Sequence, residues 1–299
     1  MTPSSMSLMA KYTVLGGPSS EQLARKIATK LKSRYVGCEL RVFPDGESKI
    51  TIKGKPTGKI IVVQSVYPPV DSNLIRAFAL LSEAKKYSSQ VYAVIPYIGY
   101  QRQDRQFLPG EVVTMALVAK LFKAVGVSKV IIIDVHSMRA INLFGIPTKN
   151  VSAVEVLSKY FKRLKLKDPL VVSPDVGGYQ RAKDFARHLG VDFIVLEKHR
   201  DRKTGKVTIK QANHDEVRGR DTILVDDIIS TGGSIVKAAQ YLKSQRCARV
   251  YATCTHAVLI GDAEKQIRKA GVTRIVSTNT IPGKTSIVDV SGIIAKAIS

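Results

Sequence analysis

The chain of 299 residues is 44% hydrophobic and 24% charged, which is ordinary for a globular protein and sufficient for two domains, each with its own core. Its 47 Lys and Arg residues against 24 Asp and Glu residues give a net charge of +23, which favours anionic partners, either nucleic acid or phosphorylated metabolites. The basic residues are dispersed along predicted helices, which disfavours nucleic acid as the partner, and no apolar run approaches the roughly 20 residues that a membrane-spanning helix needs.

Segments typical of strands and of helices alternate along the chain. Apolar, β-branched runs bounded by Gly, Pro or polar residues predict strands buried on both faces, at 12–17, 59–66, 91–97, 129–136, 169–175, 192–199, 222–228, 249–257 and 274–280. Amphipathic helices are predicted between them, at 21–32, 73–87, 114–126, 154–164, 178–190 and 234–245. A hairpin is predicted around the Pro-Asp-Gly turn at 44–46. Such alternation predicts an α/β fold with mainly parallel sheets.

The alternation is interrupted near residues 145–155, where we place a domain boundary. We predict an N-terminal domain over residues 11–150, joined by a last helix at 291–299, and a C-terminal domain over 151–290. In open parallel sheets, ligands bind at the carboxyl ends of the strands, so polar residues at those ends are the candidates for a functional site.

The segment 225–234, VDDIISTGGS, places two adjacent acids at a strand end and a glycine-containing loop before a helix. The side chains of Asp226 and Asp227 are expected on opposite sides of the strand, where a carboxylate can accept hydrogen bonds from the vicinal hydroxyls of a ribose. The loop offers hydroxyl and backbone N–H groups that suit a phosphate, from Ser230, Thr231, Gly232, Gly233 and Ser234. The segment predicts a sugar-phosphate site, and a plain strand-to-helix turn with Ser and Thr as caps is the alternative.

Three further strand ends are polar. The segment GYQRQDR at 99–105 concentrates guanidinium groups that suit a polyphosphate, although a solvated loop would have the same composition. Asp134 and His136 lie two residues apart and so share one face of their strand, and Asp175 follows another strand. This set fits a metal site and a structural role equally, because Mg²⁺ prefers oxygen ligands and a histidine ligand is unusual for it.

Lys198 and Arg200 begin a strongly basic segment. Five Lys and Arg residues lie within 198–206, together with Gly205. Such a segment fits a flap that closes on a triphosphate, and a charge run is also typical of a solvated face.

Together with FPDGE at 43–47, the segments at 99–105, 134–137, 173–178 and 197–200 resemble the ribose-phosphate diphosphokinases, the synthetases of phosphoribosyl pyrophosphate. The resemblance runs in order over residues 12–295. It implies two phosphoribosyltransferase-type domains, each a mainly parallel sheet flanked by helices. It also implies transfer of the β,γ-diphosphoryl group of MgATP to the anomeric hydroxyl of ribose 5-phosphate, giving phosphoribosyl pyrophosphate and AMP.

The resemblance also implies roles for individual residues. Lys198 and Arg200 would be the catalytic pair, and His136 and Asp175 would hold Mg²⁺. ATP would be bound by Phe43, Asp45, Gly46, Glu47, Arg102 and Gln103. Ribose 5-phosphate would be bound by Arg200, Asp226, Asp227, Ser230, Thr231, Gly232, Gly233 and Ser234. One departure is that the family's loop usually reads Asp-Thr-x-Gly-Thr, so that Ser230 replaces a carboxylate.

Two other functions remain open on the sequence. A phosphoribosyltransferase that uses phosphoribosyl pyrophosphate would share 225–234 but would give FPDGE, RQDR and DVHS no role. A non-catalytic regulator that binds nucleotide or nucleic acid is suggested by the charge of +23, yet no recognisable nucleic-acid motif is present. The three scattered cysteines read as free thiols of a cytoplasmic protein, and the resemblance implies a homo-oligomer with its ATP site near a subunit interface.

Overall fold

The computed structural model describes residues 11–200, 207–210 and 217–299, with the backbone alone for 197–200 and 207–210. The chain divides into an N-terminal unit, which ends at Val151 and regains Ser291–Ser299, and a C-terminal unit, Ser152–Val290. Each unit is built on its own six-stranded sheet.

The sheet of the N-terminal unit is parallel throughout. Its strand order is β2 (Arg34–Val36), β1 (Tyr12–Gly16), β5 (Lys59–Val63), β6 (Val91–Ile95), β7 (Lys129–Ile133) and β8 (Thr148–Val151). The central strands are apolar runs, and their side chains are almost completely buried. Both faces of this sheet are therefore covered, as parallel sheets require.

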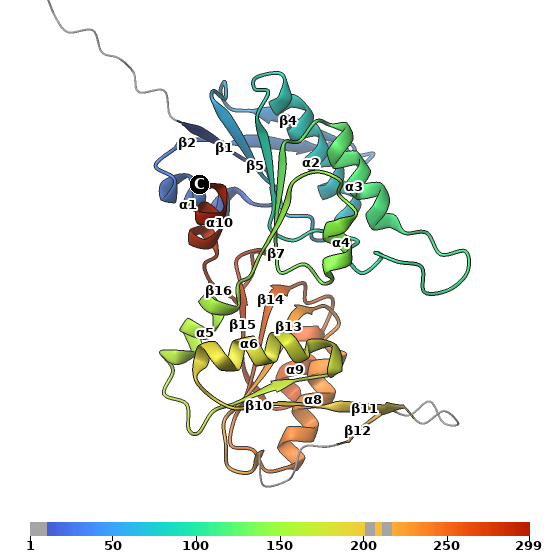
Figure 1. Cartoon of the computed structure of the whole chain (residues 1–299), viewed down its shortest axis with the longest axis vertical. Helices are drawn as coiled ribbons and strands as arrows, with labels where there is room; N and C mark the ends of the chain where they lie inside the picture. The colour runs from blue at the N-terminus through green and yellow to red at the C-terminus, as the bar shows by residue number, and fades with distance from the viewer. Residues whose placement is uncertain (1–10, 201–206, 211–216) are drawn as a thin grey trace, which may run out of the picture. The chain divides into compact units, whose positions relative to one another are not determined.

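Helices flank this sheet on both faces (Figure 1). They are α1 (Glu21–Lys30), α2 (Val70–Lys85), α3 (Thr114–Ala124), α4 (Met138–Asn142) and α10 (Ser291–Ile298). Helix α10 packs against α1 and β8, and Lys129 Nζ donates a hydrogen bond to the carbonyl oxygen of Ala297 at 3.1 Å. The last helix of the chain is thus part of the N-terminal unit.

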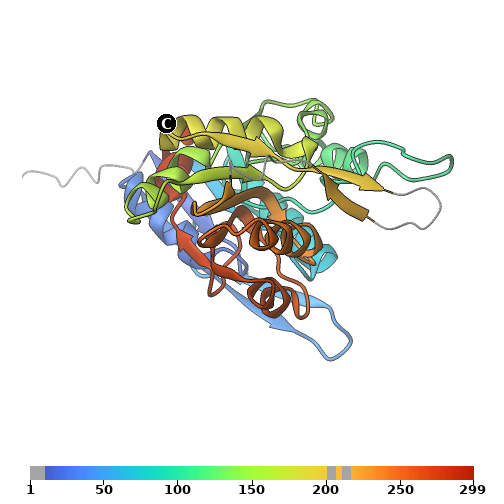
Figure 2. The same ribbon diagram turned by 90° about the horizontal axis from the view of Figure 1, so that it is seen from below.

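The predicted hairpin is confirmed. Strands β3 (Cys38–Val42) and β4 (Ser48–Ile52) pair antiparallel, and Figure 2 shows the hairpin reaching out from its unit. Its turn is closed by hydrogen bonds from Phe43 N to Glu47 O at 2.8 Å and from Gly46 N to Phe43 O at 2.9 Å. Gly46 has φ 93°, a conformation that favours glycine.

The sheet of the C-terminal unit is also parallel. Its strand order is β10 (Phe193–Val195), β9 (Leu170–Ser173), β13 (Thr222–Ile229), β14 (Val250–Ala257), β15 (Val272–Thr278) and β16 (Ser286–Val288). It is flanked by α5 (Val154–Lys162), α6 (Tyr179–Leu189), α8 (Gly233–Ser244) and α9 (Ala263–Lys269), and a short 3₁₀ helix, η1 (Val176–Gly178), precedes α6. The prediction of an α/β fold with two mainly parallel sheets flanked by helices is confirmed.

The single strand predicted at 192–199 is wrong in one respect, because the chain leaves the sheet within it. After β10, the N–H of Leu196 still donates to Ser173 O at 2.9 Å. The chain then forms β11 (Glu197–Arg200), which pairs antiparallel with β12 (Val207–Lys210) in a separate ribbon. The apolar run FIVL belongs to the sheet, whereas the charged residues after it belong to the ribbon.

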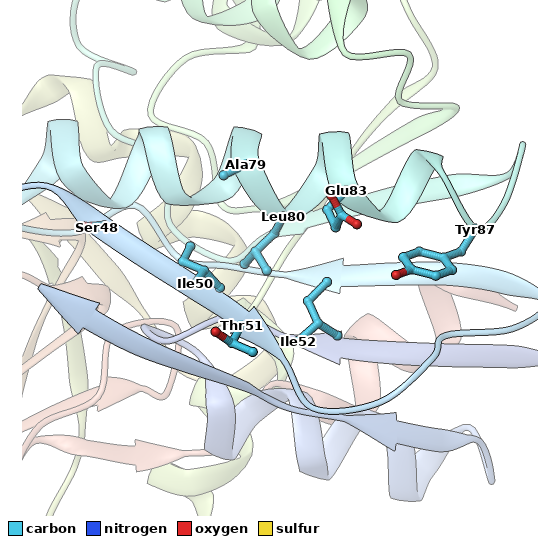
Figure 3. A pocket seen from close by; sticks show the side chains of 8 residues that line it. All are labelled: Ser48, Ile50, Thr51, Ile52, Ala79, Leu80, Glu83 and Tyr87. Carbon is cyan, nitrogen blue, oxygen red and sulfur yellow. The ribbon is translucent and has the colours of Figure 1, made fainter.

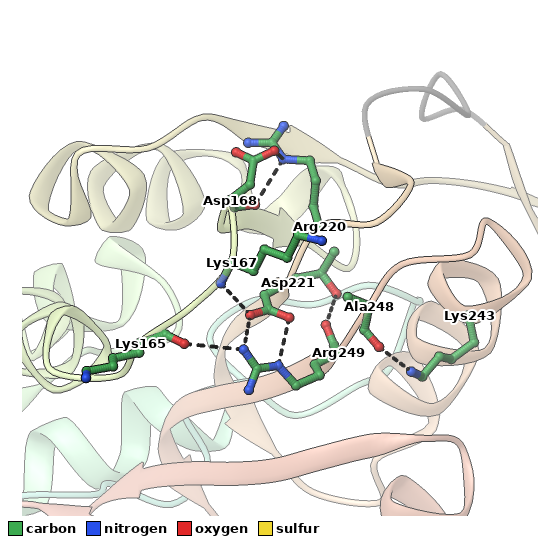
Figure 4. Close-up of polar contacts among 9 residues, drawn as sticks. Lys165, Lys167, Asp168, Arg220, Asp221, Lys243, Ala248 and Arg249 are labelled. Atoms are coloured by element: carbon green, nitrogen blue, oxygen red, sulfur yellow. Dashed lines mark hydrogen bonds and ion pairs between the residues drawn. The ribbon is translucent and has the colours of Figure 1, made fainter.

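A buried carboxylate ties together the amino ends of three strands of the C-terminal sheet (Figure 4). Asp221, which precedes β13, is fully buried and accepts hydrogen bonds from Lys167 N at 2.7 Å and from Arg249 Nε at 2.9 Å. Arg249 also donates to Lys165 O at 3.3 Å. The amino edge of this sheet is therefore held by a structural ion pair, which leaves the carboxyl edge for a site.

Candidate functional site

The register of the C-terminal sheet brings three polar strand ends to one edge. Leu224 of β13 lies opposite Val172 of β9, and Val195 of β10 lies opposite Ser173. Because the three strands are parallel, the residues that follow each of them emerge at the same edge of the sheet. The polar segments after β9, β10 and β13 are therefore neighbours.

Arg181, from the first turn of α6, contacts both acids at the end of β13. Its Nη1 lies 3.3 Å from Asp226 Oδ1, and its Nη2 lies 3.2 Å from Asp227 Oδ2. The two carboxylates therefore converge on one guanidinium, so the expectation that they point to opposite sides of the strand is wrong. The alternation of side chains holds for a regular strand, but here the N–H of Asp227 turns back to Asp226 Oδ1 at 2.9 Å and the N–H of Ile228 to Asp227 Oδ1 at 3.0 Å.

The environment of Asp226 makes its carboxyl group hard to ionise. Burial is the main cause, the nearby carboxylate of Asp227 adds to it, and the pKa of Asp226 rises to about 7 although Arg181 opposes the shift. The side chain of Asp226 keeps 22% of its surface exposed, whereas that of Asp227 keeps 5%. Asp226 is therefore the acid of this pair that a ligand can reach.

The segment after β13 forms the predicted loop and helix start. Gly232 has φ 77°, and α8 begins at Gly233. A Cβ on Gly232 would lie 2.8 Å from Ile267 Cδ1, so glycine is required there both by conformation and by space. Thr231 and Gly233 are exposed, whereas Ser230 and Ser234 are half-buried. The hydroxyls and the N-terminus of α8 thus lie where the sequence predicted an anion, and their ligand stays a prediction.

Asp175 follows β9 and precedes η1 and α6. Its carbonyl oxygen accepts a hydrogen bond from the hydroxyl of Ser173 at 2.6 Å, and its side chain is half-buried. A Cβ on Gly178 would lie 2.4 Å from Ser173 Oγ, so this turn needs a glycine to bring α6 close to the strand. The tight turn sets the start of α6 and hence the position of Arg181.

Lys198 and Arg200 lie on β11, two and four residues after Leu196, whose N–H is bonded to β9. Their backbone leaves the same carboxyl edge of the sheet, but their side chains lie outside the described residues. Their catalytic role stays a prediction.

Buried polar residues that the sequence did not single out lie at the carboxyl ends of β14 and β15. His256 is fully buried, and its Nδ1 lies 2.9 Å from the hydroxyl of Thr280. The hydroxyls of Thr278 and Thr280 both donate to the carbonyl oxygen of Thr255, at 2.8 and 3.0 Å. This network joins the ends of the two strands. The polar sequences THA at 255–257 and TNT at 278–280 could have indicated it.

In the N-terminal unit, two side-chain amides hold the segment after β7, which carries His136. The N–H of Val135 donates to Asn150 Oδ1 at 2.9 Å, and the N–H of His136 donates to Gln101 Oε1 at 2.7 Å. His136 itself is exposed. Sequence reasoning missed Gln101 and Asn150, because neither residue forms a recognisable pattern with His136.

Arg102 and Gln103 follow β6 and are both exposed. The segment turns sharply, since the N–H of Gln103 donates to Tyr100 O at 2.7 Å, and it is joined to the start of α3 by the bond from Met115 N to Gln103 O at 3.1 Å. Gly99 permits the turn, because a Cβ there would lie 2.5 Å from Val70 Cγ1. The two side chains are available to a ligand.

The turn of the hairpin presents the remaining predicted nucleotide residues. Asp45, Gly46 and Glu47 are exposed and Phe43 is half-buried. The guanidinium of Arg41 stacks on the ring of Phe43 at 4.9 Å, and Asp45 Oδ1 accepts from Glu47 N at 3.1 Å. One face of the aromatic ring is therefore covered by a cation within the hairpin itself.

A pocket of about 380 Å³ lies in the same unit between β4 and α2 (Figure 3). Its lining combines aliphatic side chains with Glu83 and Tyr87, and the complete lining is Ser48, Ile50, Thr51, Ile52, Ala79, Leu80, Glu83 and Tyr87. No lining residue was predicted as a site residue.

The predicted metal ligands, His136 and Asp175, belong to different units. Within the described part of the chain, no group of three or more His, Cys, Asp and Glu side chains is suited to holding a metal ion. Asp175 offers the carboxylate oxygen that Mg²⁺ prefers, and Mg²⁺ usually keeps several waters and binds through substrate phosphates beside one or two protein carboxylates.

The parallel sheets, the acidic strand end and the loop before α8 define a protein of the phosphoribosyltransferase type. Residues 12–126 match the model of the N-terminal domain of ribose phosphate pyrophosphokinase, and residues 151–289 match that of the phosphoribosyl transferase domain. The chain belongs to the ribose-phosphate pyrophosphokinase family, as the motifs had indicated.

Relatives with this name cover almost the whole chain. The ribose-phosphate pyrophosphokinase of Sulfolobus acidocaldarius is 36% identical over 290 residues, which are 95% of this chain and 99% of that protein. The one of Campylobacter jejuni is 35% identical over 278 residues, 92% of this chain and 89% of that protein. The crystal structure of phosphoribosylpyrophosphate synthetase from Mycobacterium smegmatis is similar with a TM-score of 0.84 at 25% identity, covering 96% of this chain and 97% of that one. The described residues contain no helix with the length and hydrophobicity that a membrane crossing requires.

Proposed function

We propose that this chain is a ribose-phosphate diphosphokinase, which transfers the β,γ-diphosphoryl group of MgATP to the anomeric hydroxyl of ribose 5-phosphate and releases AMP. The observation that carries the proposal is the end of β13, where a reachable carboxylate, Asp226, lies beside the loop and N-terminus of α8. This arrangement offers acceptors for sugar hydroxyls and donors for a phosphate on one short segment. Membership of the family supports the same reaction.

Ribose 5-phosphate would bind in the C-terminal domain, residues 151–290. Asp226 would accept hydrogen bonds from the ribose hydroxyls, with Asp227 held behind it by Arg181. The 5-phosphate would take backbone N–H groups and hydroxyls of residues 230–234, and Arg200 would add a positive charge. Ser230 would contribute a neutral hydroxyl to this loop.

ATP would bind in the N-terminal domain, residues 11–150 together with 291–299. The exposed Arg102 and Gln103 would contact the polyphosphate. The hairpin turn would contact the nucleoside through Phe43, Asp45, Gly46 and Glu47. Since Arg41 covers one face of the Phe43 ring, adenine would stack on the other face.

His136 and Asp175 would hold the magnesium of MgATP. The ion, when bound, neutralises phosphate charge and orients the polyphosphate. The residues of this chain would position the two substrates in line, and Lys198 and Arg200 would stabilise the charge that develops on the transferring group.

We further propose that the protein acts in the cytoplasm as a homo-oligomer with its ATP site near a subunit interface. Three cysteines that are free thiols, Cys38, Cys247 and Cys254, support a reducing compartment. The reach of the β3–β4 hairpin away from its own sheet supports a contact with another subunit.

The test is to incubate the protein with ATP, Mg²⁺ and ribose 5-phosphate and to measure AMP and phosphoribosyl pyrophosphate. We expect both products in equal amounts, and about 10²- to 10³-fold less of each from Lys198→Ala in the same time. Formation of a nucleotide from a base and phosphoribosyl pyrophosphate, without AMP formation from ATP, would instead indicate a phosphoribosyltransferase. Binding without any turnover would indicate a regulator.

A further inference from the structure

The side-chain amide of Gln101 is buried, and its oxygen and nitrogen atoms differ in their hydrogen bonding. Its side chain is 1% exposed, and its Oε1 accepts a hydrogen bond from the N–H of His136 at 2.7 Å. Its Nε2 is enclosed and has no hydrogen-bond partner among the residues that the structure describes. An enclosed donor without an acceptor destabilises a fold by about 1–3 kcal/mol, so native proteins rarely retain one without a reason.

Gln64, a second buried glutamine of the same unit, shows what a purely structural amide does here. It is fully buried, and its Oε1 accepts from Ser19 N at 3.3 Å. Its Nε2 lies 3.4 Å from Asn73 Oδ1 and 3.5 Å from Asn73 O. The oxygen and the nitrogen of the Gln64 amide are thus both hydrogen-bonded to protein groups, whereas the Nε2 of Gln101 has no acceptor among the described residues.

The place of Gln101 in the chain indicates what this donor is for. Gln101 directly precedes Arg102 and Gln103, and its oxygen holds the backbone of His136. One side chain therefore joins the segment after β6 to the segment after β7. In the proposed function, the first of these segments carries the polyphosphate of ATP and the second carries a ligand of its magnesium.

We propose that Gln101 is a positioning residue for the magnesium nucleotide: its Oε1 fixes the segment that carries His136, and its Nε2 donates to a phosphate oxygen of the bound nucleotide. This inference rests on the proposed function, since it takes ATP as the ligand of residues 101–103. Because Nε2 is enclosed in this structure, nucleotide binding must shift the 101–103 segment for the donor to reach that oxygen.

The test compares Gln101→Met, Gln101→Glu and the matched control Gln64→Met by isothermal titration. The probes are α,β-methylene-ATP with Mg²⁺, which cannot transfer its diphosphoryl group, and ribose 5-phosphate in a separate titration. We expect Gln101→Met to weaken the nucleotide about 10- to 100-fold, the range for a hydrogen bond to a charged group, and to leave ribose 5-phosphate unchanged. Gln101→Glu keeps the acceptor for His136 but replaces the donor by a negative charge, so it should weaken the nucleotide at least as much.

Thermal unfolding without ligand separates positioning from packing. Gln101→Met removes an unpaired buried donor together with the hydrogen bond from the N–H of His136. Water can replace that bond because His136 is exposed, so the unfolding midpoint should stay close to that of the unsubstituted protein. Gln64→Met breaks satisfied hydrogen bonds, so it should unfold at a lower temperature and still bind the nucleotide normally. Unchanged nucleotide affinity in Gln101→Met, an equal loss in Gln64→Met, or normal affinity in Gln101→Glu would each overturn the inference. A protein that forms no AMP but binds the analogue would contradict the proposed function and still decide the role of Gln101.

Discussion

The substitution Asp226→Asn should make the protein less sensitive to pH between about pH 4 and about pH 7. In the folded protein, burial and the neighbouring Asp227 raise the pKa of Asp226 to about 7, against the opposing charge of Arg181. Over this range the folded state therefore keeps a proton that the unfolded state releases, and the stability of the fold falls as pH rises. The amide of an asparagine does not titrate, so Asp226→Asn should not show this fall.

The size of the effect follows from the two pKa values. The pKa of Asp226 is about 7 against an ordinary 3.8, and each unit corresponds to about 1.4 kcal/mol. The loss of stability attributable to this carboxyl group is therefore up to about 4 kcal/mol, complete above about pH 7. Even half of this value exceeds the error of a denaturation experiment on one protein.

Urea unfolding of both proteins at about pH 5, 6, 7 and 8 measures the difference. Asp221→Asn is the matched control, because Asp221 is at the other end of β13. Burial works against ionisation of Asp221 as well, but the hydrogen bonds from Arg249 and from the N–H of Lys167 outweigh it and lower its pKa. Its stabilising contribution is lost only as pH falls through that lowered pKa, so Asp221→Asn should be less stable by a constant amount over this range.

The ionisation of Asp226 should also change the affinity for ribose 5-phosphate. The ionised form of Asp226 accepts hydrogen bonds from ribose hydroxyls best, so the affinity of the unsubstituted protein for ribose 5-phosphate should rise from about pH 6 to about pH 8. Asp226→Asn should bind it about 10- to 100-fold more weakly at about pH 8, with ATP affinity little changed. Parallel stability profiles for the two proteins would refute the raised pKa, and weaker ATP with unchanged ribose 5-phosphate would reverse the assignment of the site.

Three other substitutions test separate parts of the proposal. Lys198→Ala should lower kcat about 10²- to 10³-fold with little change in either KM, and near-normal turnover would make it a surface lysine. His136→Ala should raise the Mg²⁺ concentration needed for half-maximal nucleotide binding while ribose 5-phosphate still binds, and an unchanged magnesium titration would assign His136 a structural role. Gly232→Ala should destabilise the protein by about 1–3 kcal/mol in urea unfolding, because its φ of 77° is unfavourable for Ala and the new Cβ meets Ile267, whereas an equal midpoint would mean that the loop relaxes.

The long buried strands could be predicted from the sequence because each of them is recognisable from the composition of its own segment. A strand covered on both faces by helices needs an unbroken apolar run, as at 60–63 in β5 or 130–133 in β7. The helices between them have the periodicity of a half-buried surface. Short elements do not have this signal: β2, β8 and β16 have three or four residues each and are strands only because a neighbouring strand pairs with them.

The polar strand ends could be found in the same way, but the contacts between them could not. Asp226 and Asp227 are adjacent in sequence, whereas Arg181 lies 45 positions away on a helix of ordinary amphipathic pattern. Likewise, Gln101 and His136 are 35 positions apart and meet only because β6 and β7 are neighbours in the sheet. Sequence spacing predicts which face of an element a residue occupies, and the sheet order decides which residue it meets.

Arg181 also accounts for the combination of two acids at this strand end. Two carboxylates in a partly buried site repel each other, and without a cation both would be driven toward their neutral forms. One guanidinium that contacts both keeps Asp227 paired in the interior and leaves Asp226 near the balance between its two forms, since its pKa is about 7. A group at that balance responds strongly to what binds beside it, because a ligand that donates hydrogen bonds to the carboxylate favours ionisation. The proton equilibrium of Asp226 and the binding of a sugar phosphate beside it are therefore linked. The residue that sets this link is Arg181, which lies outside the segments 197–200 and 225–234.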